Sequence, residues 1–140
     1  MKPAMWGKRM QRVALGAAFS LMPAAGAVAQ SAPPRLLVMD LPYVRVWEGT
    51  VRAFGEQTIA RAADGVIETT RAERAPLPDE AGVERVAERV TIRVEPMADR
   101  VTRITVTVEA EGLQGGSWRA IDPSPVTVRA VLDRIRASIG

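Results

Sequence analysis

The fold is decided by residues 89–111, which read RVTIRVEPMADRVTRITVTVEAE. Apolar and polar side chains alternate in the first part of this stretch and again in its last part, and β-branched residues dominate both. Side chains of a strand point alternately to its two faces, so the pattern predicts two strands, each with one apolar and one polar face. The residues between them, 96–100, predict the turn of a hairpin.

The charged side chains predict how the two strands align. When Ile92 faces Val106, the apolar residues of both strands share one face. In the same register Glu95 lies opposite Arg103 on the other face, and a second pair of opposite charges forms further along. Each such pair contributes about 0.2–1 kcal/mol, and a slip by one residue would turn the apolar face to water. We therefore predict this register.

The N-terminus has the three parts of a secretory signal. Residues 1–12 carry four basic residues and no acid, residues 13–29 are small and apolar, and the segment ends in the triplet AVA. We expect cleavage after Ala29, a flexible lead-in over residues 30–34 and a single domain over residues 35–140. The alternative is an uncleaved anchor, but the apolar run is shorter than the ~20 residues that span a bilayer. The sequence therefore predicts a periplasmic or secreted protein without a stable membrane anchor.

Removal of this signal changes the charge of the chain. The whole sequence has 19 basic and 16 acidic residues, and the signal holds four of the basic residues and none of the acids. The remainder therefore has a formal charge of −1, which gives no support for nucleic acid or an anionic membrane as a partner. Cysteine is absent from the sequence, so neither disulfides nor a lipidated cysteine can contribute. A domain of ~110 residues must then fold on its hydrophobic core alone.

Two stretches have the periodicity of amphipathic helices. The first follows Asp40 as the predicted cap and Pro42 in the first turn, and Gly55 is predicted to end it. Its predicted apolar face consists of Val44, Trp47, Val51 and Phe54. The second has Ser124 as its predicted N-cap and Pro125 as its first residue. Its predicted apolar face consists of Val128, Val131, Leu132, Ile135 and Ile139.

The remaining segments predict the other strands and the loops. Residues 35–39 form a short apolar run, and residues 58–71 predict a second hairpin around Gly65. Residues 75–84 predict an exposed loop, and residues 112–117 predict a flexible break before the last helix. The element order is then β-α-β-β-β-β-α. We predict an α+β domain with a mostly antiparallel four- or five-stranded sheet and two helices on one face, the other face being polar.

The residue inventory leaves little for catalysis. Histidine is absent as well as cysteine, and both lysines lie in the signal. This excludes histidine bases and triads, thiol chemistry, Schiff bases and most zinc or iron sites. Two pairs of acids remain, Asp79 with Glu80 and Glu109 with Glu111. We interpret both pairs as solvated surface residues and prefer this to the alternatives, the catalytic pair of a carboxylate hydrolase or a calcium site. We predict no catalytic residue, no cofactor and no metal site.

The tryptophans offer one candidate contact surface. Trp47 lies on the predicted apolar face of the first helix and is interpreted as core. Trp118 follows the glycine-rich residues 112–117, which lack the lysine and the spacing of a phosphate-binding loop. We interpret Trp118 first as a packing residue. Trp118 precedes Arg119, and tryptophan and arginine are both common at contact surfaces, so Trp118 and Arg119 together are also a candidate partner contact.

Several short motifs resemble those of small bacterial envelope proteins. They are Pro42-Tyr43-x-x-Val46-Trp47 at the start of a helix, Asp64-Gly65-Val66-Ile67 at a hairpin, Arg93-Val94-Glu95-Pro96 at the end of a strand, and a C-terminal Ser-Pro helix. Over residues 36–140 the chain is similar to domains of the C lipoprotein of the outer-membrane β-barrel assembly machine and to related uncharacterised small lipoproteins. This resemblance implies a helix-grip-like α+β domain with an accessory, non-enzymatic role in the envelope. The chain departs from that family by lacking the lipidated cysteine.

These observations favour an exported, non-enzymatic accessory or interaction protein that contacts another envelope protein. The alternative is a periplasmic small-molecule carrier with a cavity between helices and sheet. Packing of Trp47, Phe54 and Ile135 without a void would argue against that carrier, and clustered buried acids would revive a hydrolase. Residues 35–39, at the edge of a sheet, could also recruit a strand of a partner.

Overall fold

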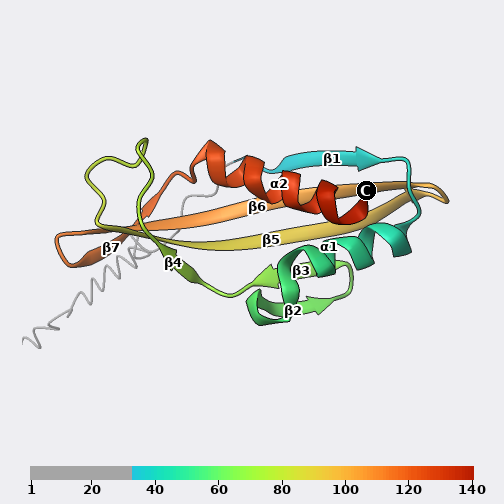
Figure 1. Cartoon of the computed structure of the whole chain (residues 1–140), viewed down its shortest axis with the longest axis horizontal. Coiled ribbons are helices and arrows are strands. Elements are labelled where there is room, and N and C mark those ends of the chain that lie inside the picture. The colour runs from blue at the N-terminus through green and yellow to red at the C-terminus, as the bar shows by residue number, and fades with distance from the viewer. Residues whose placement is uncertain (1–32) are drawn as a thin grey trace, which may run out of the picture.

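The computed structural model describes residues 33–140, apart from the side chains of Glu56 and Gln57. Its elements in chain order are β1 (Arg35–Met39), α1 (Tyr43–Thr58), β2 (Ile59–Ala63), β3 (Val66–Thr69), β4 (Ala72–Arg74), β5 (Arg85–Ala98), β6 (Val101–Gln114), β7 (Ser117–Ile121) and α2 (Pro125–Ile139) (Figure 1). The predicted signal over residues 1–29 lies outside the described residues. Within residues 33–140, no helix is long and apolar enough to cross a membrane.

The seven strands within residues 33–140 form one antiparallel sheet. Its main path is β1-β6-β5-β3-β2, and β4 and β7 extend it by pairing with β5 and β6 respectively. Both helices lie on the same side of this sheet, with α2 along β6 and α1 over β3 and β5 (Figure 1). The predicted antiparallel α+β, helix-grip-like architecture is confirmed. The strand count is corrected from four or five to seven, since β4 and β7 come from segments without a predicted strand.

The central hairpin of β5 and β6 pairs in the predicted register. Ile92 lies opposite Val106, Glu95 lies opposite Arg103, and the Nη2 atom of Arg103 donates to Oε2 of Glu95 at 2.6 Å. Its apolar side chains face the helices and are almost fully buried; they are Val90, Ile92, Val94, Ile104, Val106, Val108 and Ala110. The other face is polar and partly exposed, as predicted.

Residues 112–117 form the turn of a further hairpin and not the predicted flexible break. β6 continues to Gln114, Gly115 and Gly116 form the turn with φ angles of 56° and 81°, and β7 begins at Ser117. Glycine adopts positive φ at no steric cost, and a two-residue hairpin turn can require it at both positions. The two glycines therefore reverse the chain, and β5 and β6 extend beyond their predicted ends because β4 and β7 pair with them there.

α1 buries a different face from the predicted one. Val46 and Thr50 are fully buried and Phe54 nearly so, whereas Val44 is 61% exposed. These buried positions are spaced by four residues, so they form one stripe. Thr50 can lie in the core because its hydroxyl donates to the carbonyl of Val46 at 2.7 Å. A helix face chosen by hydrophobicity alone omits this threonine, so the predicted buried face is displaced by one residue from the observed one. Trp47, on the predicted face, packs only against the margin of the core.

The helix ends differ in how well they follow the prediction. Ser124 caps α2 as predicted, since its Oγ accepts from the backbone N–H of Val126 at 3.2 Å. The N-cap of α1 is Pro42, and no side chain of the described residues forms a capping hydrogen bond there, so Asp40 is not its cap. Gly55 breaks the helical backbone with a φ of 65°, but α1 continues beyond this kink to Thr58.

Candidate functional site

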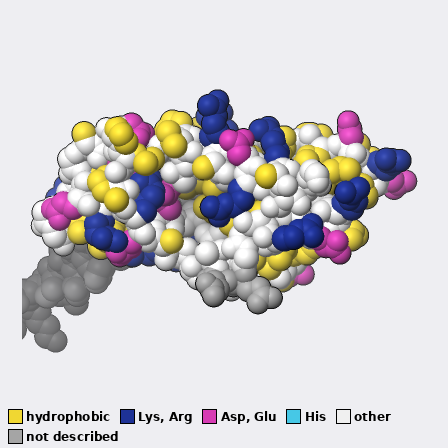
Figure 2. All heavy atoms as spheres, in the orientation of Figure 1, with side chains coloured by type: hydrophobic (Ala, Val, Ile, Leu, Met, Phe, Trp, Pro, Cys, Tyr) yellow, Lys and Arg dark blue, Asp and Glu magenta, His cyan; other side chains and the backbone are white. Residues whose placement is uncertain are grey.

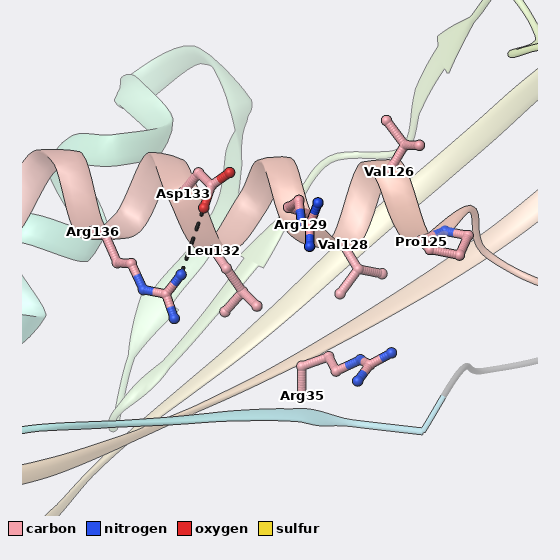
Figure 3. A pocket seen from close by; sticks show the side chains of 8 residues that line it. All are labelled: Arg35, Pro125, Val126, Val128, Arg129, Leu132, Asp133 and Arg136. Carbon is pink, nitrogen blue, oxygen red and sulfur yellow. Dashed lines mark ion pairs between the residues drawn. The ribbon is translucent and has the colours of Figure 1, made fainter.

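A groove of about 600 Å³ lies between α2 and the edge strand β1 (Figure 3). It contains two valines and a leucine together with three arginines, and only one acid. The side chains that line it are Arg35 of β1 and Pro125, Val126, Val128, Arg129, Leu132, Asp133 and Arg136 of α2. The sequence predicted a possible contact with a partner strand at residues 35–39, which include Arg35, but it named no residue of α2 as part of a site, and the lining residues come from the two ends of the domain.

Helical and strand geometry together aim most of these side chains into the groove, and Val126 lies at its rim (Figure 3). Arg129, Leu132 and Arg136 follow one another at spacings of three and four, so they share one flank of α2. Arg35 lies opposite Val106, whose side chain is buried beneath the helices, so Arg35 also points to the helix side of the sheet. Figure 3 shows Arg35 rising from β1 toward α2.

The groove is electrically positive. Three guanidinium groups and one carboxylate line it, which gives a formal charge of +2. Asp133 faces the Nη1 atom of Arg136 at 3.6 Å, and both side chains are more than half exposed. Within residues 33–140, neither Arg35 nor Arg129 forms an ion pair (Figure 3). Figure 2 shows basic side chains standing among hydrophobic patches on the helix-bearing face.

A buried ion cluster fixes the loop that holds the N-terminus of α2. Arg74 of β4 donates through Nη1 and Nη2 to the two carboxylate oxygens of Glu80, at 2.6 and 2.9 Å, and through Nε to Glu88. Next to Glu80, Asp79 accepts from Oγ of Ser124 at 2.9 Å. The cluster therefore ties the loop of residues 75–84 to the sheet and to the α2 turn that leads into the groove.

The contact between Arg74 and Glu80 favours the charged form of both groups. The hydrogen bonds from Arg74 lower the pKa of Glu80 below its ordinary value, and a further bond from the backbone N–H of Leu77 acts in the same direction. The hydrogen bond to Glu80 raises the pKa of Arg74 above its ordinary value. The second oxygen of Glu88, Oε2, is buried and has no hydrogen-bond partner within residues 33–140.

The acid pairs singled out in the sequence are thus only partly solvated. Glu80 is 9% exposed, so the solvated interpretation is wrong for this residue. Its carboxylate is occupied by Arg74, which makes it a structural anchor and not a free acid. Glu111 meets Arg71 at 3.5 Å on the polar face of the sheet, whereas Glu109 lies exposed opposite Arg89. No cluster of acids suited to a metal ion occurs within residues 33–140.

The predicted contact residues Trp118 and Arg119 lie next to each other on β7. Trp118 pairs with Leu113 and Arg119 with Gly112, so their side chains point to opposite faces of the sheet. The guanidinium of Arg71 covers the Trp118 ring at 4.4 Å from its centroid, which shields part of the aromatic face. The two residues stay a predicted contact, but they cannot present one common face to a partner.

Side chains of the helices and the sheet pack together in one hydrophobic core. Phe54 and Ile135 belong to one buried cluster with the central strands, and Trp47 packs against it. At Gly49 an added Cβ would lie 2.5 Å from Ile139, so α1 and α2 are in close contact there. The groove of about 600 Å³ lies at the edge of this packed core, beside β1.

The fold defines a class of α+β proteins in which two helices cover one face of an antiparallel sheet. No family model and no curated protein sequence matches the chain. Similar solved structures include a conserved protein from Geobacillus kaustophilus, with 10% identity over 76% of this chain and 90% of that chain and a TM-score of 0.38. A protein from Nitrosospira multiformis has 15% identity over 79% and 93% of the two chains, with a TM-score of 0.40. A point mutant of norcoclaurine synthase from Thalictrum, in complex with a transition-state analogue, has 11% identity over 80% and 93%, with a TM-score of 0.36.

Proposed function

We propose that the protein is an exported, non-enzymatic interaction protein of the bacterial envelope, and that it binds an acidic surface of another envelope protein in the groove between α2 and β1. The observation that carries this proposal is the combination of three arginines with apolar side chains in one open groove. The N-terminal signal pattern and the resemblance to small envelope lipoproteins support the location. The absence of histidine and cysteine from the sequence supports a role in binding.

The chemistry of the groove suits a protein partner. Guanidinium groups bind carboxylates with two parallel hydrogen bonds, and arginine is enriched among the residues that dominate protein interfaces. Leu132 and the methyl groups of Val126 supply apolar area beside the charges, and Val126 is 59% exposed. Arg35 and Arg129 approach from opposite walls, so an acidic side chain between them can meet both. An interface of this kind gains selectivity from charge and affinity from the apolar contact.

Photocrosslinking from the rim of the groove, at Val126, tests this proposal. A photoreactive residue at Val126 is expected to capture an envelope protein, whereas the same residue at Met97 is not, although Met97 is exposed to a similar extent. Capture from Val126 should be lost with Arg129→Glu and retained with Arg100→Glu, which makes the same charge change at the turn between β5 and β6. Equal capture in both charge variants, or no capture from Val126, would refute the proposed binding surface.

A second candidate function is carriage of an anionic amphiphile in the same groove. Its volume lies within the roughly 300–1,000 Å³ typical of small-molecule sites. The apolar part of such a ligand would lie along Val128 and Leu132, and its carboxylate or phosphate would meet Arg35 and Arg129. A fluorescent fatty acid that binds the full chain, and binds more weakly to Arg129→Glu, would favour the carrier. Absence of binding while the Val126 crosslink persists would favour the interaction protein.

The proposed export is tested separately. Fractionation of producing cells should place the protein outside the cytoplasm, and N-terminal sequencing of that protein should begin at Gln30. If the protein stays in the cytoplasm with its first residues intact, the proposed location in the envelope is wrong. The groove experiments would still stand, because they do not depend on location.

A further inference from the structure

The two edges of the sheet are built differently. The edge strand β2 has a register irregularity between Ile59 and Arg61, and its exposed residues are alanine and arginine. Irregularities and charges of this kind are the usual means by which proteins prevent another strand from pairing with an edge. All five residues of β1 pair regularly with β6, and they read RLLVM. Within residues 33–140, one edge is therefore protected, and no strand pairs with the outer side of the other.

The edge at β1 presents apolar side chains to solvent. Leu36 and Val38 are 62% and 59% exposed, and they lie opposite Thr105 and Arg103 on the polar face of the sheet. On the helix side of the same edge lies the groove with its formal charge of +2. A strand placed beside β1 would therefore meet apolar side chains on one face and guanidinium groups on the other.

We propose that the partner supplies an extended segment that pairs with β1 as an additional strand of the sheet, with acidic residues alternating with apolar ones. This inference rests on the proposed binding function of the groove and specifies the partner. Side chains of a strand alternate between its faces, so the acidic residues enter the groove toward Arg35 and Arg129 while the apolar ones cover Leu36 and Val38. The backbone groups of β1 that point away from β6 supply the hydrogen bonds.

Charge decides against a second copy of this chain as the occupant. Antiparallel pairing of β1 with itself would place Leu36 of one copy beside Val38 of the other, which is favourable. The same pairing would bring together two grooves of like charge, each with the same three arginines. Like charges across an interface oppose association, whereas an acidic strand neutralises the groove.

Two peptides of equal composition test the alternation. Acetylated and amidated VEVEV has the required pattern, and VVEEV contains the same residues without it. In titrations of the full chain followed by NMR, VEVEV is expected to bind about tenfold or more tightly than VVEEV, because only VEVEV places acids on one face and valines on the other. Arg129→Glu should weaken VEVEV about fivefold or more, while Arg100→Glu should leave its affinity unchanged.

Backbone pairing is tested with N-methylated peptides. Alternate N–H groups of an added strand point toward β1, so methylation at the third residue and methylation at the second residue should have unequal effects. One of the two peptides should lose about tenfold or more in affinity, because it loses a backbone hydrogen bond and meets a steric clash, and the other should bind normally. Bound VEVEV should also slow amide hydrogen exchange within residues 35–39. The double variant Leu36→Lys/Val38→Lys should abolish this protection.

The outcomes separate this inference from the function on which it rests. Equal binding of VEVEV and VVEEV, equal binding of both methylated peptides, or unchanged exchange in β1 would overturn strand addition. The proposed function would survive that result if the Val126 crosslink still depended on Arg129. A concentration-dependent dimer that Leu36→Lys/Val38→Lys dissociates would identify a second copy as the occupant and overturn the heterologous partner. Loss of the crosslink together with absence of peptide binding would refute both.

Discussion

Glu80 accepts hydrogen bonds from both terminal nitrogens of Arg74, at 2.6 and 2.9 Å, and so anchors a loop that composition alone marks as solvated. The side chain of Glu80 is 5% exposed and that of Arg74 is 26% exposed. The neighbouring Asp79 accepts from Ser124, the N-cap of α2. The pair therefore connects β4 with the start of the helix that forms one wall of the groove.

Replacement of Glu80 should destabilise the protein. Glu80→Gln keeps the shape of the side chain but leaves Arg74 with one carboxylate, that of Glu88, in a largely buried setting. We expect a loss of about 2–3 kcal/mol in the free energy of unfolding, measured by urea denaturation. Glu73→Gln is the matched control, because Glu73 pairs with Arg71 and Arg85 at the surface, where such pairs contribute less than about 1 kcal/mol. Equal losses in the two variants would contradict a special role of the buried pair.

The same pair predicts a pH dependence. The pKa of Glu80 is lowered in the folded protein, so the unfolded chain takes up its proton at a higher pH than the folded one. The stabilisation is therefore complete well above the ordinary value of 4.5 and is lost as the pH falls through the lowered pKa. In urea denaturation across this acidic range, the free energy of unfolding should fall more steeply with decreasing pH for the wild type than for Glu80→Gln. The two curves should converge at the lowest pH, and a constant difference would argue against Glu80 as the titrating group.

The buried face of α1 can be tested with two valines of one helix. Val46 is fully buried, so Val46→Ala should cost about 1.5–3 kcal/mol in unfolding free energy. Val44 is 61% exposed, so Val44→Ala should change it by less than about 0.5 kcal/mol. Thermal and urea unfolding of both variants provide the measurement. The reverse order of the two losses would restore the face predicted from the sequence.

Because the two helices are in close contact at Gly49, a glycine-to-alanine substitution there should lower the stability of the protein, although this substitution usually stabilises a helix. Alanine in place of a helical glycine gains about 1 kcal/mol in an exposed helix. At Gly49 the new Cβ would lie 2.5 Å from Cγ1 of Ile139, so we expect Gly49→Ala to destabilise the protein by about 1–2 kcal/mol net. In the double variant with Ile139→Ala, the combined loss should be smaller than the sum of the two single losses. Strict additivity would show that the two residues do not clash.

The sequence predicted correctly those features that depend on a local pattern, and it failed for features that depend on contacts with elements distant in the chain. The register of β5 and β6 follows from alternation within one stretch, so Ile92 and Val106 could be paired from the sequence. The face of α1 depends on what packs above and below it, and Thr50 enters the core only because its hydroxyl bonds back to the helix. The adjacent glycines Gly115 and Gly116 are compatible with both a break and a tight turn, and the pairing of β7 with β6 selects the turn.

The sequence by itself determined the central hairpin, its register, the cap and face of α2, and the shortage of catalytic residues, because each depends on neighbours or on composition. Only the tertiary structure decided the groove, since Arg35 and Arg129 are 94 residues apart in the chain and line the same groove because β1 pairs with β6 near α2. It also decided the role of Glu80, whose partner Arg74 lies on a strand that exists only through its pairing with β5. Alternation carries information along a strand, but it cannot specify which distant side chains the packed sheet and helices bring together.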